Sequence, residues 1–130
     1  MLIIRSQQMA ALCAAMQRRF TDRLMPHLRR LAPAQTRSLD DAALRAVAEA
    51  GLARAAGHGI TTEWDLCRFV LHHLRLGSGF ETDPRFAWAR DILARNDLDG
   101  RRKLDRLDYH YFHVLMRHPE AGGRDETETR

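Results

Sequence analysis

The stretch of sequence that decides the fold is TEWDLCRFVLHHLRLG, residues 62–77. Its first four residues resemble a capping box, in which the Thr62 hydroxyl and the Asp65 carboxylate bond the free amides of a first helical turn. Ile60 stands just before this cap, where an apolar side chain can pack back onto the helix, and Gly77 ends the pattern. We expect one helix whose buried face consists of Trp64, Cys67, Val70, Leu71 and Leu74.

Toward the N-terminus, similar signals predict two further helices. A long first helix, which Ser6 can cap, carries one apolar face formed by Met9, Leu12, Cys13, Met16, Phe20, Leu24, Leu28 and Leu31. Pro26 should kink or divide this helix near Met25, because proline lacks an N–H and its ring clashes with the preceding turn. The second helix begins with a capping pattern at Ser38–Asp41 and ends at Gly57–Gly59, and its alanine-rich surface should let a neighbouring helix approach closely.

Toward the C-terminus, the sequence predicts a loop and two more helices. Phe80 is the only large apolar residue of the loop, so we expect it to plug back into the core. Asp83-Pro84 is typical of an N-cap followed by proline at the first helical position. The turn Asn96–Gly100 then leads into a last helix that ends by Pro119.

These patterns predict an all-α fold, a compact bundle of about five helices in one domain that spans residues 1–119. A chain of 130 residues with 45% hydrophobic residues can bury a core without disulfides or a structural metal. Residues 120–130 are polar, acidic and contain glycine, so we expect a disordered tail. No run approaches the roughly 20 apolar residues of a membrane span, and the start of the chain turns polar too soon for a signal peptide. A cytoplasmic location is therefore expected.

The net charge of +4 is distributed unevenly along the chain. Residues 1–37 hold seven arginines against one acidic residue, residues 38–119 hold twelve basic and twelve acidic residues, and residues 120–130 hold two against four. The excess positive charge thus belongs to the first helix. Of the 21 basic residues only Lys103 is a lysine. A genome rich in GC would produce the same preference for arginine, so this preference does not by itself indicate a function.

Tests for specific chemistry in the sequence find little. His110 and His113 can share a helix face, but a metal site needs further ligands in matched geometry. The stretch Asn96–Gly100 looks like a calcium loop, but Arg95 and Arg106 then occupy positions that require acidic ligands. Cys13 and Cys67 lie inside apolar patterns that predict buried thiols, and no nucleophile, phosphate-binding or metalloenzyme motif is present. We therefore predict no cofactor, no metal and no enzymatic activity.

Three segments resemble a group of small helical bacterial proteins that are encoded near type VI secretion effectors, adaptors and spike proteins. The segments are GITTEWDLCRF at 59–69, LGSGFETDP at 76–84 and WARDIL at 88–93, and the similarity extends over residues 5–95. The group carries no catalytic residues to transfer. The resemblance implies an accessory role, such as a chaperone or adaptor that holds an effector or helps to load it onto the spike.

The sequence thus predicts a surface that binds another protein, namely an effector, an adaptor or a spike component. On a helical wheel Arg18 and Arg29 fall together, while the other three arginines of the helix flank its apolar stripe. The predicted partner-binding residues are Arg18, Arg19, Arg23, Arg29 and Arg30 of the first helix with Phe80, Asp83 and Arg85 of the 77–88 region. Two alternatives stay open: a nucleic-acid-binding helical protein, and an immunity protein or small enzyme of a toxin locus. A merely solvated arginine face is the simplest reading of the first helix.

Overall fold

The computed structural model describes residues 2–116, with side chains from residue 11 onward except that of Cys13. Its α-helices are α1 (Leu2–Leu31), α2 (Pro33–Thr36), α3 (Asp41–Ala55), α4 (Glu63–Leu76), α5 (Ala87–Leu93) and α6 (Gly100–His110). Short 3-10 turns form η1 (Ala56–His58), η2 (Phe80–Thr82) and η3 (Pro84–Phe86), and a π-turn forms η4 (Tyr111–Leu115). No strand occurs within residues 2–116, which confirms the predicted all-α fold. The predicted acidic tail and the thiol of Cys13 lie outside the described residues and side chains.

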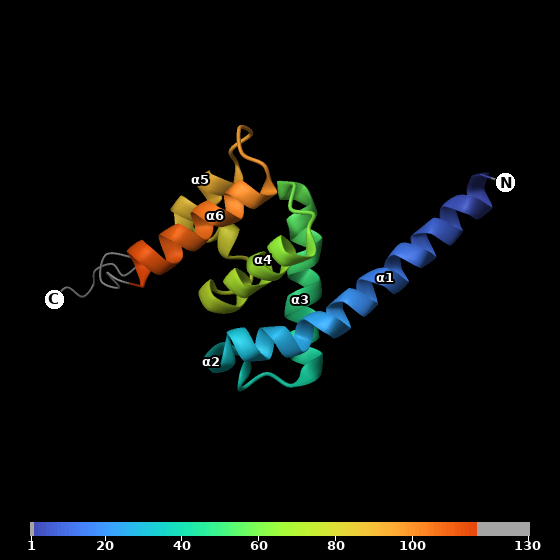
Figure 1. Cartoon of the computed structure of the whole chain (residues 1–130), viewed down its shortest axis with the longest axis horizontal. Helices are drawn as coiled ribbons and strands as arrows, with labels where there is room; N and C mark the ends of the chain where they lie inside the picture. Colours follow the sequence, from blue (N-terminus) through green and yellow to red (C-terminus); the bar gives the residue numbers. More distant parts are fainter. Residues whose placement is uncertain (1, 117–130) are drawn as a thin grey trace.

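Helix α4 is the centre of the molecule, because its side chains enter two hydrophobic clusters. The first cluster joins α4 to α1 and α3 through Leu24, Leu28, Leu44, Ala48, Leu52, Val70 and Leu71. The second joins α4 to η2, α5 and α6 through Phe69, Phe80, Ala89, Leu93, Leu104 and Leu107. Figure 1 shows α3, α4 and α6 grouped together, with α5 behind α6. The prediction that Phe80 plugs the core is confirmed, since only 1% of this residue is exposed.

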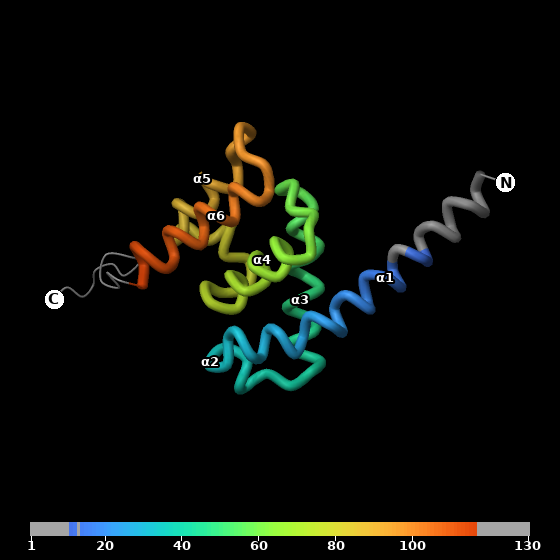
Figure 2. Tube along the Cα trace, in the orientation of Figure 1, coloured from blue at the N-terminus to red at the C-terminus, as the bar shows by residue number. Residues whose placement is uncertain are grey.

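Helix α1 is longer than the helices on which it packs. Thirty residues correspond to about 45 Å of helix, whereas the fifteen residues of α3 correspond to about 22 Å. The described part of α1 before Phe20 therefore extends outward from the other helices (Figure 2). There Leu12 is 52% exposed and Met16 is 56% exposed. Leu31 is 39% exposed, so the apolar face of the first helix is not buried along its whole length.

Pro26 bends α1 without dividing it. The helix is continuous through Pro26, and in Figure 1 its axis changes direction within the pale-blue part that contains this residue. One turn earlier, the Thr21 hydroxyl donates a hydrogen bond to the Gln17 carbonyl at 2.9 Å, a contact that also favours bending. Packing of Leu24 and Leu28 in the core holds the helix together on both sides of the proline.

The helix starts agree with the sequence at α4 and α6 and differ from it at α1, α3 and α5. Helix α1 begins at Leu2 and runs through Ser6, the predicted cap. Thr62 accepts a hydrogen bond from the Asp65 amide at 3.3 Å, and Asp99 accepts one from the Arg102 amide at 2.9 Å. At α3, however, the N-cap is Asp40, which accepts from the Ala43 amide at 2.8 Å, and not Ser38. Asp83 caps as predicted, but the segment that it caps is the 3-10 turn η3, and α5 begins only at Ala87.

Candidate protein-interaction groove

A groove of about 580 Å³ lies between α1 and the start of α4. We call it the α1–α4 groove, and it is lined by Phe20, Arg23, Leu24, His27, Arg30, Leu31, Glu63, Trp64 and Cys67. Apolar side chains form much of its lining, and the positively charged side chains of Arg23 and Arg30 lie among them. The groove is open to solvent, because Trp64, Leu31 and both arginines are exposed. It is thus a surface on which another molecule can dock.

Trp64 differs most from its predicted place. The sequence places it on the buried face of its helix, but 56% of the residue is exposed. It lies in the first turn of α4, which Thr62 caps, where the helix borders α1 rather than the inner core. Exposed tryptophans with an apolar neighbourhood are typical of protein-binding sites, because a large flat ring buries much area while few torsions are fixed.

The helical geometry of α1 explains which of its residues reach the groove. Side chains advance about 100° per residue, so Phe20, His27 and Leu31 share one sector while Met25 and Leu28 face the core. Met16 and Leu12 precede Phe20 at steps of four residues, so they lie about 40° and about 80° round the helix from it, on the side of Arg30. The exposed apolar line of α1 therefore leads directly into the groove.

The charged side chains at the groove are mostly positive, and the contacts that they form within the fold are weak. Arg23 Nη2 lies 2.8 Å from Glu63 Oε2, but both side chains are more than half exposed, so this ion pair contributes little stability. The Arg23 guanidinium also lies 5.7 Å from the centre of the Phe20 ring. Arg30 contacts the His27 ring. Burial raises the pKa of Cys67, so its thiol at the edge of the groove stays protonated and unreactive at neutral pH.

The structure separates the five arginines that the sequence groups together. Arg23 and Arg30 line the α1–α4 groove, and Arg19 is exposed in the neighbouring sector. Arg18 lines a smaller hollow on the other side of α1, beside Glu49 and Ala53. Arg29 is engaged within the fold: it donates hydrogen bonds at 3.0 Å to the carbonyls of Thr36 and Leu39, and at 2.8 Å to Asp41.

Arg29 therefore has a structural role, and this gives a first test. Arg29→Ala should lower the free energy of unfolding by about 1.5 kcal/mol, because two backbone carbonyls lose a charged donor at a partly exposed site. Arg30→Ala, one residue along, should change stability little. Urea denaturation of both variants checks this, and equal stabilities would show that Arg29 does not hold the connection from α1 to α3.

The residues predicted in the 77–88 region do not join the groove. Phe80 is buried and cannot contact a partner, so its prediction as a partner-binding residue is corrected. Asp83 and Arg85 are bonded to each other: the Arg85 guanidinium donates to Asp83 at 2.8 Å, and its amide donates at 3.0 Å. Neither of them lines the groove. The two halves of the predicted surface are thus separate.

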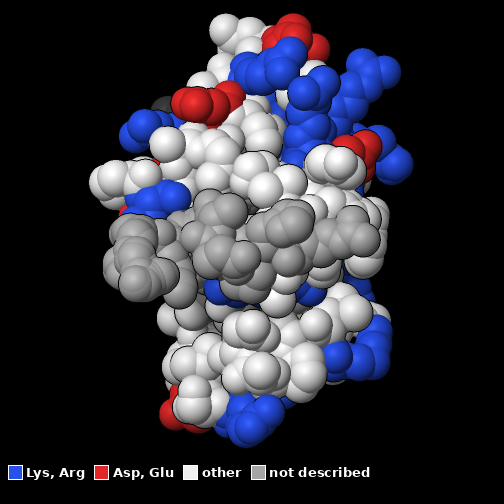
Figure 3. Space-filling model, turned by 90° about the vertical axis from the view of Figure 1, so that its left-hand side faces the viewer, with Lys and Arg blue, Asp and Glu red and all other residues white. Residues whose placement is uncertain are grey.

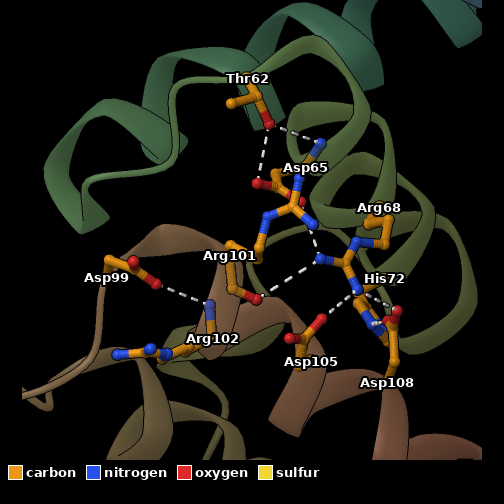
Figure 4. A network of polar contacts seen from close by, with 9 residues as sticks. All are labelled: Thr62, Asp65, Arg68, His72, Asp99, Arg101, Arg102, Asp105 and Asp108. Atoms are coloured by element: carbon orange, nitrogen blue, oxygen red, sulfur yellow. Dashed lines mark hydrogen bonds and ion pairs between the residues drawn. The ribbon is translucent and has the colours of Figure 1, made fainter.

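A polar network between α4 and α6 fixes the position of α4, and it was not predicted from the sequence. Figure 4 shows the Arg68 guanidinium between α4 and α6. Arg68 donates at 2.7 Å to Asp65, at 2.8 Å to Asp108 and at 3.0 Å to Asp105. Asp65 is only 1% exposed and also accepts the Thr62 hydroxyl at 2.7 Å. The network holds the helix turn that carries Trp64.

The charges in this network favour ionised carboxylates. Burial disfavours the Asp65 anion, but the hydrogen bonds from Arg68 and Thr62 outweigh burial and hold the pKa of Asp65 below its ordinary value. Burial likewise disfavours the Asp108 anion, and bonds from His72 and Arg68 lower its pKa overall. The spacing of Asp65 and Arg68, three residues apart on one helix, is the signal that could have indicated part of the network.

A second buried polar group lies where α4 meets η2. His73 accepts a hydrogen bond from the Gly79 amide at 3.1 Å through Nδ1, so its Nε2 carries the proton and faces Glu81 Oε1 at 3.7 Å. Arg54 donates to the other oxygen of Glu81 at 3.0 Å. Burial lowers the pKa of His73 to about 4, and the negative charge of Glu81 offsets this only in part. His73 is thus neutral in the folded protein at neutral pH.

This neutral histidine predicts a pH dependence. Between pH 6.5 and about 4 the unfolded chain holds a proton on residue 73 that the folded protein does not, so stability falls as the pH falls through this window. His73→Gln should flatten the change of Tm across it, while His113→Gln at an exposed site should not. Thermal unfolding at several pH values measures this, and an unchanged slope in His73→Gln would contradict the assignment.

Within the described part of the chain, no group of three or more His, Cys, Asp or Glu side chains could hold a metal ion. The same residues include no helix long and apolar enough to cross a membrane. Figure 3 shows Lys and Arg side chains gathered at the end of the molecule where α6 begins in Figure 1. The exposed residues Arg101, Arg102 and Arg106 lie there. The exposed acidic residues Asp97, Asp99 and Asp105 lie at the same end, so the charge there is mixed.

The arrangement offers recognition through an apolar groove with a cationic edge, and the described side chains show no assembled catalytic group in it. The two alternatives, a nucleic-acid-binding helical protein and an immunity protein or small enzyme of a toxin locus, stay predictions. Comparison with known proteins finds no matching family model, no matching curated protein and no matching solved structure.

Proposed function

We propose that this protein is a non-enzymatic protein-interaction module that holds its partner in the α1–α4 groove. The observation that carries the proposal is the exposed Trp64 beside an apolar groove edged by Arg23 and Arg30. Protein interfaces combine an aromatic or apolar centre with a polar rim, and Trp and Arg are the residues that most often dominate their binding energy. If the arginine face of α1 were only solvated surface, an exposed tryptophan beside it would have no explanation.

The finer proposal is an adaptor or chaperone for a secreted bacterial effector, acting in the cytoplasm in the context of type VI secretion. Its support is the sequence resemblance of residues 59–93 together with the groove. A chaperone or adaptor needs a docking surface on a stable body. Here the two hydrophobic clusters provide the body, and the outer face of α1 and Trp64 provide the surface.

The test uses Trp64→Ala in the full chain, co-expressed with the effector, adaptor and spike proteins of a type VI secretion locus. Loss of the exposed tryptophan of the groove should weaken capture of the partner about 30-fold or more, equivalent to about 2 kcal/mol. The matched control is Tyr109→Ala, since Tyr109 is 63% exposed on α6 and does not line the groove. Both variants should keep the wild-type Tm.

Two results would overturn the proposal. One is a partner that binds Trp64→Ala and the wild type equally well. The other is tight binding of DNA or RNA at low salt that falls steeply with added salt and is indifferent to Trp64→Ala. The second result would favour the nucleic-acid alternative, with the exposed arginines Arg101, Arg102 and Arg106 as the contact.

A further inference from the structure

We infer that the occupant of the α1–α4 groove is an amphipathic helix of a partner protein, with an apolar face flanked by carboxylates. This inference rests on the proposed function and names the chemistry of the partner. It is argued from the shape of the groove, the apolar line that extends it and the sign of the charges along its edge.

The shape of the groove suits a helix. Two packed helices, α1 and α4, leave a hollow of about 580 Å³ between them, with Leu24 at its base and Trp64 at its edge. A third helix can lie in such a hollow with side chains at i, i+3, i+4 and i+7 directed inward. A flat bilayer surface cannot reach the base of a hollow between two helices.

The apolar line of α1 sets the length of the partner helix. Leu12, Met16, Phe20 and Leu31 form a line on α1 that spans about 100° of its circumference, and all four are exposed or half-exposed. From the first to the last of them the helix rises about 28 Å, which equals the length of a helix of about 19 residues. A partner helix of about five turns would cover Leu12 and Met16 as well as the groove itself.

The charges along the groove indicate that the partner helix is negatively charged. Arg23 and Arg30 stand in the groove lining with His27, and Arg19 lies in the adjacent sector of α1. Glu63 is the only acidic residue of the lining, and it is already paired with Arg23. A second copy of this chain, bound through the same face, would bring these arginines against each other. Carboxylates on the partner would instead form charge-assisted bonds with them.

The experiment uses two designed helical peptides of about 20 residues, a length that follows from the rise per residue. Both carry the same leucine face, and the positions beside it are glutamates in one peptide and lysines in the other. Fluorescence anisotropy of each labelled peptide is measured with the full chain. The glutamate peptide should bind at least about tenfold more tightly at low salt, and the difference should shrink as salt rises.

Two triple variants test where the preference arises. R19E/R23E/R30E should reverse it, so that the lysine peptide binds more tightly than the glutamate peptide. R101E/R102E/R106E makes the same change in net charge at the exposed start of α6, away from the groove, and should keep the glutamate preference. The double variant L12Q/M16Q should weaken the binding of both peptides without changing which peptide binds more tightly.

The outcomes separate this inference from the function proposed above. Equal binding of the two peptides, or a preference that R101E/R102E/R106E removes, overturns the acidic helix. Capture of a partner protein through Trp64 with no binding of either peptide leaves the proposed function standing and overturns the helical occupant. Trp64-dependent binding to vesicles of anionic lipid, with neither peptide bound, would make the occupant a membrane surface instead.

Discussion

Replacing Arg68 with methionine should lower the free energy of unfolding by about 3–5 kcal/mol, which is the usual effect of removing one member of a buried charge group. Arg68 donates to Asp65, Asp105 and Asp108, and so connects α4 to α6. Without it Asp65 would keep only the Thr62 hydroxyl as a side-chain partner, at a site with almost no access to water. A loss of this size is a large fraction of the stability of a small domain.

The reason for this loss can be isolated by a second substitution. Arg68→Met with Asp65→Asn removes the uncompensated charge and keeps a partner for the Thr62 hydroxyl, so the double variant should recover much of the lost stability. Arg85→Met is the control, because Arg85 is exposed and forms its ion pair with Asp83 alone. Urea denaturation of the wild type, Arg68→Met, Asp65→Asn, the double variant and Arg85→Met measures each effect and the coupling between the two sites. If the effects of Arg68→Met and Asp65→Asn simply add, unpaired charge is not what destabilises the single variant.

Replacing Gly100 with alanine should be the most disruptive single-methyl change in the described chain. A Cβ at this position would lie 2.4 Å from the Gly59 carbonyl oxygen and 2.9 Å from the Ile60 Cα, both of which are backbone atoms. Forcing extra volume into such a contact costs roughly 1–3 kcal/mol or more. Ile60 packs in the second hydrophobic cluster, so moving its backbone would also disturb the contact of α6 with the core.

The matched control for Gly100→Ala is Gly57→Ala. A Cβ at Gly57 would meet nothing within 4 Å, and the backbone there needs no positive φ. Gly57→Ala should therefore leave Tm unchanged or raise it slightly, because alanine has less conformational freedom than glycine in the unfolded chain. Calorimetry on both variants makes the comparison. Equal values of Tm would mean that the start of α6 does not press on Gly59.

Most of the helices could be predicted from the sequence, because the signals for them are local. Thr62 and Gly77 bound α4 through contacts with residues at most six positions away. Asp99 bounds α6 in the same way. The error at Ser38 arose because Ser38 and Asp40 are both good caps, and only the bond of Asp40 to the Ala43 amide decides between them.

The candidate site could be predicted only in part. The sequence identifies the arginine face of the first helix, and Arg23 and Arg30 do line the groove. It does not separate Arg29 from Arg30, because the carbonyls of Thr36 and Leu39 that bind Arg29 are placed by the turn after α1. Nor does it indicate that Trp64 is exposed. An apolar residue at helical spacing has the same pattern whether its side of the helix meets a neighbour or water.

The sequence by itself thus determined the all-α class, several helix boundaries such as those of α4, and the positive first helix, since periodicity, caps and charge are properties of short stretches of chain. Only the tertiary structure decided which apolar residues find a partner within the fold. Helix α1 is about twice as long as α3, so Leu12 and Met16 lie on a part of it where they remain exposed, and α4 meets α1 at its first turn, where Trp64 also remains exposed. The groove follows from these lengths and positions, which no single segment of sequence contains.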